Sequence, residues 1–382
     1  MSLDRIKNSP SLDMVNMVLS KQAAGQKVWS LAIGEPSFDT PRSIIEVAHR
    51  AMTEGETHYT SSYGTSRVRQ AISEKVNRKN RIRCTPENSI FLTTKFAVYA
   101  SLVSVLDKES EVLIPDPGYF YSEPVILAGG SPKRYPLSEG FQLDVDDIKS
   151  RIGRRTRAVV INSPSNPTGS VFRKADLREL LATCIERNVT LLSDEAYEDL
   201  TYGREHVSIG SFEREPERVV SIFSFSKSYA MTGWRAGYVI AAPRIVARIA
   251  KFLENTYTSY PPFIQSACAF ALENCDRDIA RFRRELWERK RLAEEALESI
   301  RGLEPFKAQG AFYLFPTYTQ KMSSRMLAAK LLENENVAVL PGTAFGPRGE
   351  HHFRISFAGP PRVTEQALER MGSFFLTLRR RA

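Results

Sequence analysis

Short apolar runs alternate with amphipathic stretches along most of this chain, and that alternation restricts the folds open to it. Each run is long enough for one buried strand, and the stretches between runs carry apolar residues three and four positions apart, as helices do. The runs occupy residues 90–93, 111–114, 158–161, 189–192, 219–223 and 237–241. The clearest helical stretches are 97–106, 174–187 and 276–300. Because strands that alternate with helices pair in parallel and are covered on both faces, the sequence predicts an α/β fold.

The pattern changes after about residue 275. Strand-like segments beyond this point are separated by Pro and Gly and lie at residues 310–315, 337–340 and 353–357. An amphipathic helix is expected near the N-terminus, at residues 12–24. A chain of 382 residues suits about two domains. We therefore predict a large domain at 41–275, a smaller α+β domain at 276–382, and a segment 1–40 that packs with the smaller domain.

Composition and charge argue against several kinds of partner. No apolar run approaches the ~18 residues of a membrane helix, and the N-terminus lacks the apolar stretch of a signal peptide, so we expect a cytoplasmic protein without a membrane partner. The 53 Lys and Arg residues outnumber the 44 Asp and Glu residues, but they are spread out and lack aromatic neighbours, which disfavours nucleic acid. The four cysteines lie far apart and have no metal-ligand spacing with the five histidines, so no metal site is predicted.

Polar side chains follow three of the predicted strands, at the point where each strand ends. The three segments are NSPSNPTG at 162–169, SDEAY at 193–197, and SFSK at 224–227 with Arg235 shortly after. In an open parallel sheet, ligands bind beyond the carboxyl ends of the strands. An amide, a carboxylate, a phenol, a lysine, a hydroxyl and a guanidinium can therefore meet in one crevice, and these are the groups that pyridoxal phosphate requires. No GxGxxG follows a predicted strand and no GxxxxGK[ST] occurs, which disfavours dinucleotides and nucleoside triphosphates.

The same segments carry a resemblance to a known family. The segment SFSKSYAMTGWRAG at 224–237 is similar to the cofactor-attachment signature of the fold-type I, class I and II pyridoxal-phosphate aminotransferases. Four further motifs occur in the family's order, namely LAIGEPSFDTP at 31–41, NSPSNPTG, SDEAY and FRISF at 353–357. The resemblance covers nearly the whole chain. It implies pyridoxal 5′-phosphate as cofactor, and a mostly parallel seven-stranded sheet between helices with a smaller α+β domain built from both chain ends.

The resemblance assigns catalytic roles to three side chains. Lys227 would form the imine with the cofactor and then carry the proton between the substrate α-carbon and the cofactor. Asp194 would keep the pyridine nitrogen protonated. Tyr197, together with Asn166, would bind the ring oxygen of the cofactor.

Other residues of these motifs would bind the phosphate and the face of the ring. Ser224 and Arg235 match the family's phosphate ligands. Tyr119 matches the aromatic residue that stacks on the pyridine ring. Tyr59 matches a tyrosine that reaches the phosphate of the neighbouring subunit, which implies a homodimer with shared active sites.

Residues 93–97 depart from the family pattern. Most members have glycine after the corresponding strand, where a helix N-terminus approaches the phosphate, whereas this chain has Thr-Thr-Lys-Phe-Ala. Backbone N–H groups do not require glycine, so we expect the amides of Phe96 and Ala97 to bind the phosphate. Lys95 would add positive charge there.

The resemblance also implies the substrates, an amino acid and a 2-oxo acid. Arg354 would clamp the substrate α-carboxylate, helped by the Gly34 backbone and the Asn166 amide. Aspartate with 2-oxoglutarate is the favoured pair, and aromatic, alanine and kynurenine aminotransferases stay open. A pyridoxal-phosphate lyase of the carbon–sulfur type is an alternative on the same scaffold. A regulator fused to a DNA-binding domain is disfavoured, because only about thirty residues precede Gly34.

Overall fold

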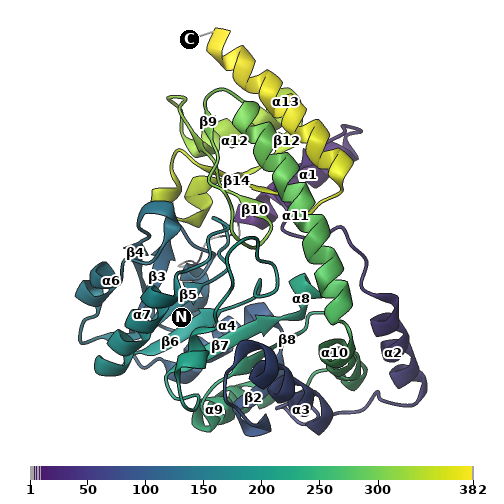
Figure 1. Cartoon of the computed structure of the whole chain (residues 1–382), viewed down its shortest axis with the longest axis vertical. Coiled ribbons are helices and arrows are strands. Elements are labelled where there is room, and N and C mark those ends of the chain that lie inside the picture. The colour runs from purple at the N-terminus through teal and green to yellow at the C-terminus, as the bar shows by residue number, and fades with distance from the viewer. Residues whose placement is uncertain (1–3, 5, 7, 9, 381–382) are drawn as a thin grey trace.

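The computed structural model describes residues 4, 6, 8 and 10–380, and its largest element is a seven-stranded sheet (Figure 1). The spatial order of the strands is β2-β8-β7-β6-β5-β3-β4. Their bounds are Ser89–Leu92 for β2, Glu111–Asp116 for β3, Ser131–Pro136 for β4, Thr156–Asn162 for β5, Thr190–Asp194 for β6, Val219–Ser224 for β7 and Gly237–Ile240 for β8. Only β8 runs antiparallel to its neighbours, so the prediction of a mostly parallel sheet is confirmed.

One strand of this sheet, β4, has no counterpart among the predicted apolar runs. It lies at the sheet edge, has a proline at 132 and another at 136, and buries only one of its six residues. Proline is tolerated at an edge because the missing N–H would face solvent. An edge strand with a single buried residue lacks the continuous apolar run of the central strands, which is why the sequence pattern does not indicate it.

Helices cover both faces of the sheet. Neighbouring residues of one strand separate the two sides, because Val112 packs into one core cluster and Leu113 into the other. The first cluster includes residues from α2 (Arg42–Thr53), α3 (Ser66–Lys75), α4 (Thr94–Val105), α5 (Ser122–Leu127), α9 (Pro243–Glu254) and α10 (Pro262–Asn274). The second includes residues from α6 (Val145–Arg151) and α7 (Lys174–Glu186). This two-sided burial is the arrangement that the alternating sequence pattern predicts.

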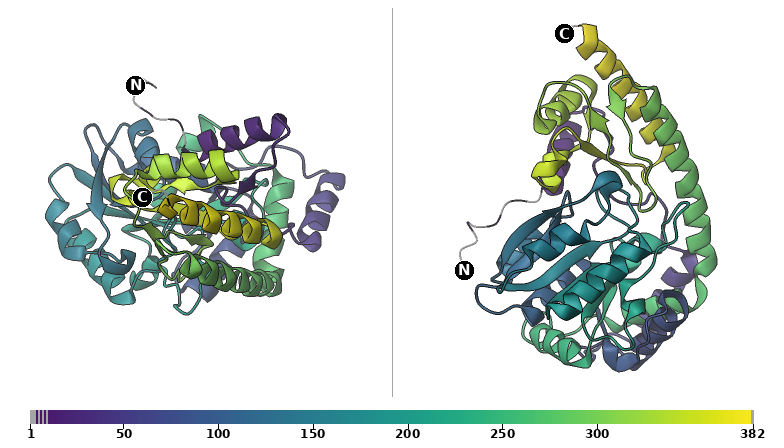
Figure 2. Two further views of the ribbon diagram at one scale, coloured as in Figure 1. Left: turned by 90° about the horizontal axis from the view of Figure 1, so that it is seen from above. Right: turned by 60° about the vertical axis from the view of Figure 1, so that its left-hand side comes forward.

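A long helix, α11 (Asp276–Ser299), leads from the sheet into the second part of the molecule (Figures 1 and 2). Asp276 and Asp278 lie in its first turn, where negative charge stabilises the helix dipole. Its apolar residues recur at helical spacing, and Phe282, Leu286 and Leu297 are buried. None of the described helices is long and apolar enough to cross a membrane.

The second part contains short strands packed against helices. Strands β10 (Tyr313–Leu314), β14 (Phe353–Ser356) and β13 (Leu340–Pro341) form an antiparallel sheet, and β9 (Leu303–Glu304) pairs with β11 (Thr317–Tyr318). Helices α12 (Ser324–Glu335) and α13 (Pro361–Arg380) pack around them.

Both ends of the chain contribute to this part of the molecule. Strand β1 (Trp29–Ser30) pairs in parallel with β12 (Val337–Ala338). Helix α1 (Pro10–Ala23) places Met14 and Val18 in a core cluster with residues of the C-terminal part. The domain boundaries at residues 40 and 275 stay predictions.

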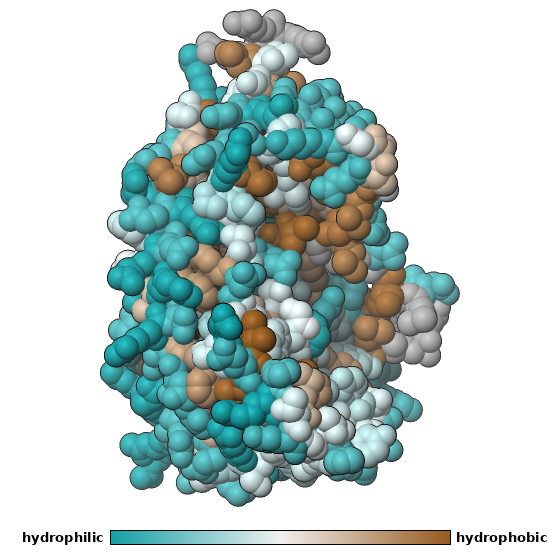
Figure 3. Space-filling view, turned by 90° about the vertical axis from the view of Figure 1, so that its right-hand side faces the viewer, coloured by the Kyte–Doolittle hydropathy of each residue, from teal (hydrophilic) through white to brown (hydrophobic). Residues whose placement is uncertain are grey.

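The face on the side of α2 and α11 is hollowed at mid-height, and hydrophobic side chains gather around the hollow (Figure 3).

Candidate active site

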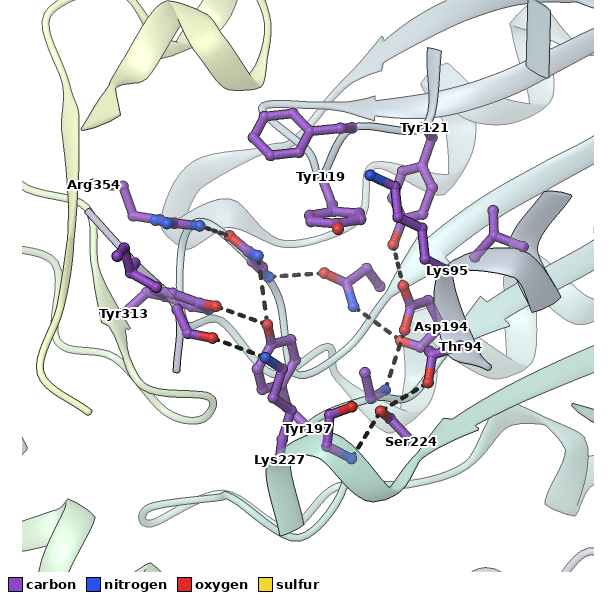
Figure 4. A pocket seen from close by; sticks show the side chains of 18 of the residues that line it. Thr94, Lys95, Tyr119, Tyr121, Asp194, Tyr197, Ser224, Lys227, Tyr313 and Arg354 are labelled. Carbon is purple, nitrogen blue, oxygen red and sulfur yellow. Dashed lines mark hydrogen bonds between the residues drawn. The ribbon is translucent and has the colours of Figure 1, made fainter. Parts of the chain in front are cut away.

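The carboxyl ends of three parallel strands form the floor of a cavity. Asn162, Asp194 and Ser224 are the last residues of β5, β6 and β7, and Asn162 lies beside Asp194 in the sheet register. The cavity has a volume of about 330 Å³, which is within the range of small-molecule sites. Figure 4 shows its side chains, with Arg354 and Asp194 on opposite sides. Ten predicted residues line it, and they are Gly34, Lys95, Tyr119, Asn166, Asp194, Tyr197, Ser224, Lys227, Arg235 and Arg354.

Lys227 lies on the short helix α8 (Phe225–Ser228), directly after β7. Its Nζ donates a hydrogen bond of 2.8 Å to the carbonyl oxygen of Gly34. Burial lowers the pKa of this amine to about 8, because the charged form loses its hydration. An amine with this pKa is partly neutral near physiological pH, as a nucleophile or a general base must be.

Asp194 is almost fully buried and lies on the side of the cavity opposite Arg354. Its Oδ2 accepts a hydrogen bond of 2.7 Å from the Tyr121 hydroxyl, and its Oδ1 accepts one of 3.2 Å from the Ala196 amide. Burial raises the pKa of the Asp194 carboxyl, and both hydrogen bonds oppose that rise. A buried carboxylate whose charge is stabilised in this way can pair with a cationic atom of a ligand.

Two phenols meet between these groups. The Tyr197 hydroxyl lies 2.9 Å from the Tyr313 hydroxyl, and it accepts a long hydrogen bond of 3.5 Å from the Asn166 amide. Tyr313 also explains why position 34 is glycine. A Cβ atom on Gly34 would lie 2.0 Å from the Tyr313 hydroxyl oxygen, far inside van der Waals contact.

Arg354 comes from β14 and is 3% exposed. Its Nη1 donates to Asn166 Oδ1 at 2.9 Å and its Nη2 to the Ala32 carbonyl oxygen at 2.5 Å. Its Nε is buried without a hydrogen-bond partner, and no ion pair joins Arg354 to a carboxylate in the described part of the chain. The guanidinium lies over the Tyr313 ring, 4.3 Å from its centroid. A buried cation without a counter-ion is unfavourable, and an anionic ligand would supply the missing charge.

A second group of polar atoms surrounds the start of α4. Thr94 Oγ1 donates to Ser224 Oγ at 2.8 Å, and Arg235 Nη2 lies 3.4 Å from Thr93 Oγ1. Gly237 leaves space for the threonine, because a Cβ atom there would lie 2.6 Å from Thr94 Oγ1. Hydroxyls, a guanidinium and a helix N-terminus together are suited to a phosphate group.

The backbone at this helix start corrects one expectation. The Ala97 amide already donates to the Thr93 carbonyl oxygen at 2.8 Å, as the first bond within the helix, so it is not free for a phosphate. The free amides of the first turn are those of Thr94, Lys95 and Phe96. The Phe96 side chain points into a cluster with Tyr99 and Phe252 and does not line the cavity.

Two predicted aromatic residues differ in their surroundings. Tyr119 lines the cavity, and burial raises the pKa of its hydroxyl to about 12. Tyr59 does not line the cavity and is 90% exposed. A residue so exposed does not pack in the core of its own chain.

Sequence reasoning gave no role to several residues that line the cavity, among them Thr94, Tyr121 and Tyr313. Thr94 lies within the segment 93–97, and Tyr121 follows Tyr119 by two positions. Tyr313 lies in the predicted strand 310–315. Their partners are 130, 73 and 116 positions away along the chain, and no local pattern records contacts at such separation.

Comparisons with known proteins agree over nearly the whole chain. The family model described as aminotransferase class I and II matches residues 26–371. The chain is 40% identical over 377 residues to an aspartate aminotransferase of Pyrococcus abyssi, covering 95% of this chain and 97% of the relative. It is 38% identical over 377 residues to aromatic-amino-acid aminotransferase 2 of Thermococcus litoralis, covering 95% and 97%. The solved structure of Thermus thermophilus aspartate aminotransferase with maleate superposes with a TM-score of 0.93 at 33% identity, covering 98% of this chain and 99% of that one.

Proposed function

The chain belongs to the class I and II aminotransferases, which use pyridoxal 5′-phosphate, and we propose that it moves the amino group of an L-amino acid, with aspartate favoured, to a 2-oxo acid such as 2-oxoglutarate. The single observation that carries the proposal is Arg354, a buried guanidinium without a counter-ion in the described part of the chain. Every amino acid and 2-oxo acid substrate brings a carboxylate that can pair with it. Both half-reactions would therefore use the same cation.

The donor set of the cavity fits the cofactor. Ser224, Thr94, Arg235 and the N-terminus of α4 would hold the phosphate. Asp194 would pair with the ring nitrogen. When bound, the cofactor supplies a pyridinium ring that takes up the electrons released from the substrate α-carbon.

Two further groups would bind the ring oxygen of the cofactor. Tyr197 and Asn166 lie next to each other, with the Asn166 amide 3.5 Å from the Tyr197 hydroxyl. Tyr313, whose hydroxyl is 2.9 Å from that of Tyr197, would keep the phenol in place. A donor pair of this kind stabilises a ring oxygen in its charged form.

Lys227 would move the proton. With a pKa of about 8, its Nζ could accept the α-proton of the substrate and then deliver it to the bound cofactor. The Gly34 carbonyl, which accepts a hydrogen bond of 2.8 Å from Nζ, would keep the amine in the cavity between these steps. A neutral amine is needed for the first step, and burial of Nζ raises the neutral fraction of the amine near physiological pH.

Lys95 supports the preference for aspartate. Four cationic residues line the described cavity, and three of them have roles in the proposal above. Lys95, the fourth, is exposed and has no hydrogen bond or ion pair to another described residue that would occupy it. The apolar residues Ile33, Val98 and Pro124 line the same cavity. A distal carboxylate would find its cation in Lys95, whereas an aromatic or aliphatic side chain would contact the apolar residues.

A donor panel tests this specificity. Aspartate, alanine, phenylalanine, tyrosine and kynurenine are offered with 2-oxoglutarate, and glutamate and the new 2-oxo acid are measured. Lys95→Met should lower kcat/KM for aspartate by about tenfold and leave that for alanine unchanged, since each tenfold factor corresponds to about 1.4 kcal/mol. Lys108→Met is the matched control, because Lys108 is an exposed lysine just beyond the other end of α4. An equal loss for both donors would refute the role of Lys95, and release of a 2-oxo acid without glutamate would favour the lyase.

The exposure of Tyr59 supports a homodimer with shared active sites. A tyrosine that is 90% exposed in the single chain is available to a second copy, and we propose that it reaches the partner's phosphate site. A mixed dimer tests this. Lys227→Ala and Tyr59→Ala chains are each inactive in the proposal, but a mixed pair would contain about one complete site. No recovery of activity in a dimer confirmed by light scattering would mean that Tyr59 does not act across the interface.

A further inference from the structure

Tyr121 holds a buried position directly behind Asp194. It is the last residue before α5, it is 1% exposed, and its hydroxyl donates to Asp194 Oδ2 at 2.7 Å. Figure 4 shows it beside the carboxylate, on the side away from Arg354. We propose that Tyr121 is a positioning residue that keeps the Asp194 carboxylate charged and oriented toward the ring nitrogen of the cofactor. This rests on the proposed pairing of Asp194 with that nitrogen.

The first reason is the charge balance of Asp194. A carboxylate that is 6% exposed loses most of its hydration, and this favours the protonated form. A protonated Asp194 could not stabilise a positive ring nitrogen. The structure compensates with two donors, the Tyr121 hydroxyl and the Ala196 amide, and the Tyr121 bond is the shorter of the two. Hydrogen bonds to an ionised acceptor are among the strongest in proteins.

The second reason is that Tyr121 can act only as a donor toward this carboxylate. Burial and the nearby Asp194 raise the pKa of the Tyr121 hydroxyl well above its ordinary value, so it stays protonated. If the hydroxyl lost its proton, two negative oxygens would face each other in the interior. The protonated phenol therefore fixes the pair in one state, a neutral donor and a charged acceptor.

The third reason is geometric. The two donors contact different oxygens of the carboxylate, so together they fix the plane of the Asp194 side chain. Tyr121 is itself held by packing, since its ring makes an edge contact with Tyr119 at 5.5 Å between centroids. Tyr119 lines the cavity as the predicted stacking residue. One rigid aromatic pair would thus position both the face contact and the nitrogen contact of the cofactor.

The matched control is Tyr135. Its ring is as buried as that of Tyr121, and its hydroxyl donates a bond of 2.8 Å, but to the Val160 carbonyl oxygen and outside the cavity. Tyr121→Phe and Tyr135→Phe therefore remove the same group from the interior, and only the first removes it from Asp194. Thermal unfolding of both variants shows how much stability each hydroxyl contributes.

The test measures binding to the apoprotein rather than activity. The first probe is pyridoxine 5′-phosphate, which has the ring nitrogen and the phosphate but no aldehyde, and the second is its deaza analogue, in which CH replaces the ring nitrogen. Tyr121→Phe should weaken the first probe by about tenfold and leave the second unchanged, because a hydrogen bond to a charged group is worth that much. Tyr135→Phe should change neither. In the Asp194→Asn background, Tyr121→Phe should have no further effect on the first probe.

These measurements distinguish a failure of the proposed role of Tyr121 from a failure of the proposed pairing between Asp194 and the ring nitrogen. If the wild-type apoprotein binds both probes equally, Asp194 does not contact the ring nitrogen, and the roles of Asp194 and Tyr121 are both overturned. If wild type prefers the first probe and Tyr121→Phe keeps that preference, only the role of Tyr121 is overturned. Equal weakening of both probes by Tyr121→Phe would also overturn it, since the hydroxyl would then support the fold and not the carboxylate.

Discussion

Replacing Lys227 by methionine should change how the stability of the apoprotein depends on pH. Burial lowers the pKa of Lys227 from 10.5 to about 8, and at about 1.36 kcal/mol for each pKa unit this corresponds to about 3 kcal/mol. At pH 7 the folded chain must keep this amine charged in an unfavourable place. Methionine has a similar length and no charge, so Lys227→Met removes this cost together with the 2.8 Å hydrogen bond to Gly34.

The sign follows from proton binding. Between pH 8 and 10.5 the unfolded chain holds a proton on Lys227 that the folded chain has lost. The contribution of Lys227 to the free energy of unfolding therefore rises with pH in this window. Well below pH 8 the amine is protonated in both states and the full cost is present. The free energy of unfolding of the wild type should therefore rise by about 3 kcal/mol relative to that of Lys227→Met between pH 8 and 10.5. Below pH 7 the difference between the two chains should change little with pH.

Urea unfolding of both apoproteins at several pH values between 7 and 10.5 provides the assay. The difference between the two chains matters, because every other titrating group is common to both. The lost hydrogen bond shifts this difference by a constant and leaves its slope unchanged. If the difference stays constant between pH 8 and 10.5, the pKa of Lys227 is ordinary, and the explanation for its neutral amine fails.

Two further predictions concern Asp194 and Gly34, which line the same cavity as Lys227. Asp194→Asn should still bind the cofactor but slow the first half-reaction with aspartate by at least tenfold, because a neutral amide does not stabilise a positive ring nitrogen. Stopped-flow absorbance measures this rate. An unchanged rate would leave Asp194 with a structural role. Gly34→Ala should destabilise the fold by about 1–3 kcal/mol, since its Cβ would lie 2.0 Å from the Tyr313 hydroxyl oxygen. The loss should be smaller in a Tyr313→Phe background, and thermal unfolding that finds equal losses in both backgrounds would refute the steric explanation.

The central sheet could be predicted from the sequence because burial on both faces makes its strands continuous apolar runs. Residues 158–161, 219–223 and 237–241 overlap β5, β7 and β8. The edge strand β4 lacked this signal, since it buries only one of its residues. The cavity floor could be predicted as well, because parallel strands bring their carboxyl ends to one edge of the sheet.

Side-chain contacts between distant segments could not be predicted in this way. The bond between Tyr121 and Asp194 joins residues 73 positions apart, and it depends on how α5 packs against the sheet. The expectation for Ala97 failed for a local reason, since it needed the helix start to within one residue. The first turn of α4 begins at Thr94, so the Ala97 amide is the first one used inside the helix.

The lysine that carries the cofactor identifies the active site of the chain. Two lysines, Lys95 and Lys227, line the cavity in the described part of the chain, and the proposal gives them different roles. Borohydride reduction of the holoenzyme converts the bond between lysine and cofactor into a stable secondary amine, and peptide mapping identifies the lysine that carries it. We expect the label on Lys227 alone. A label on Lys95, or on any lysine outside the cavity, would contradict the assignment of the active site.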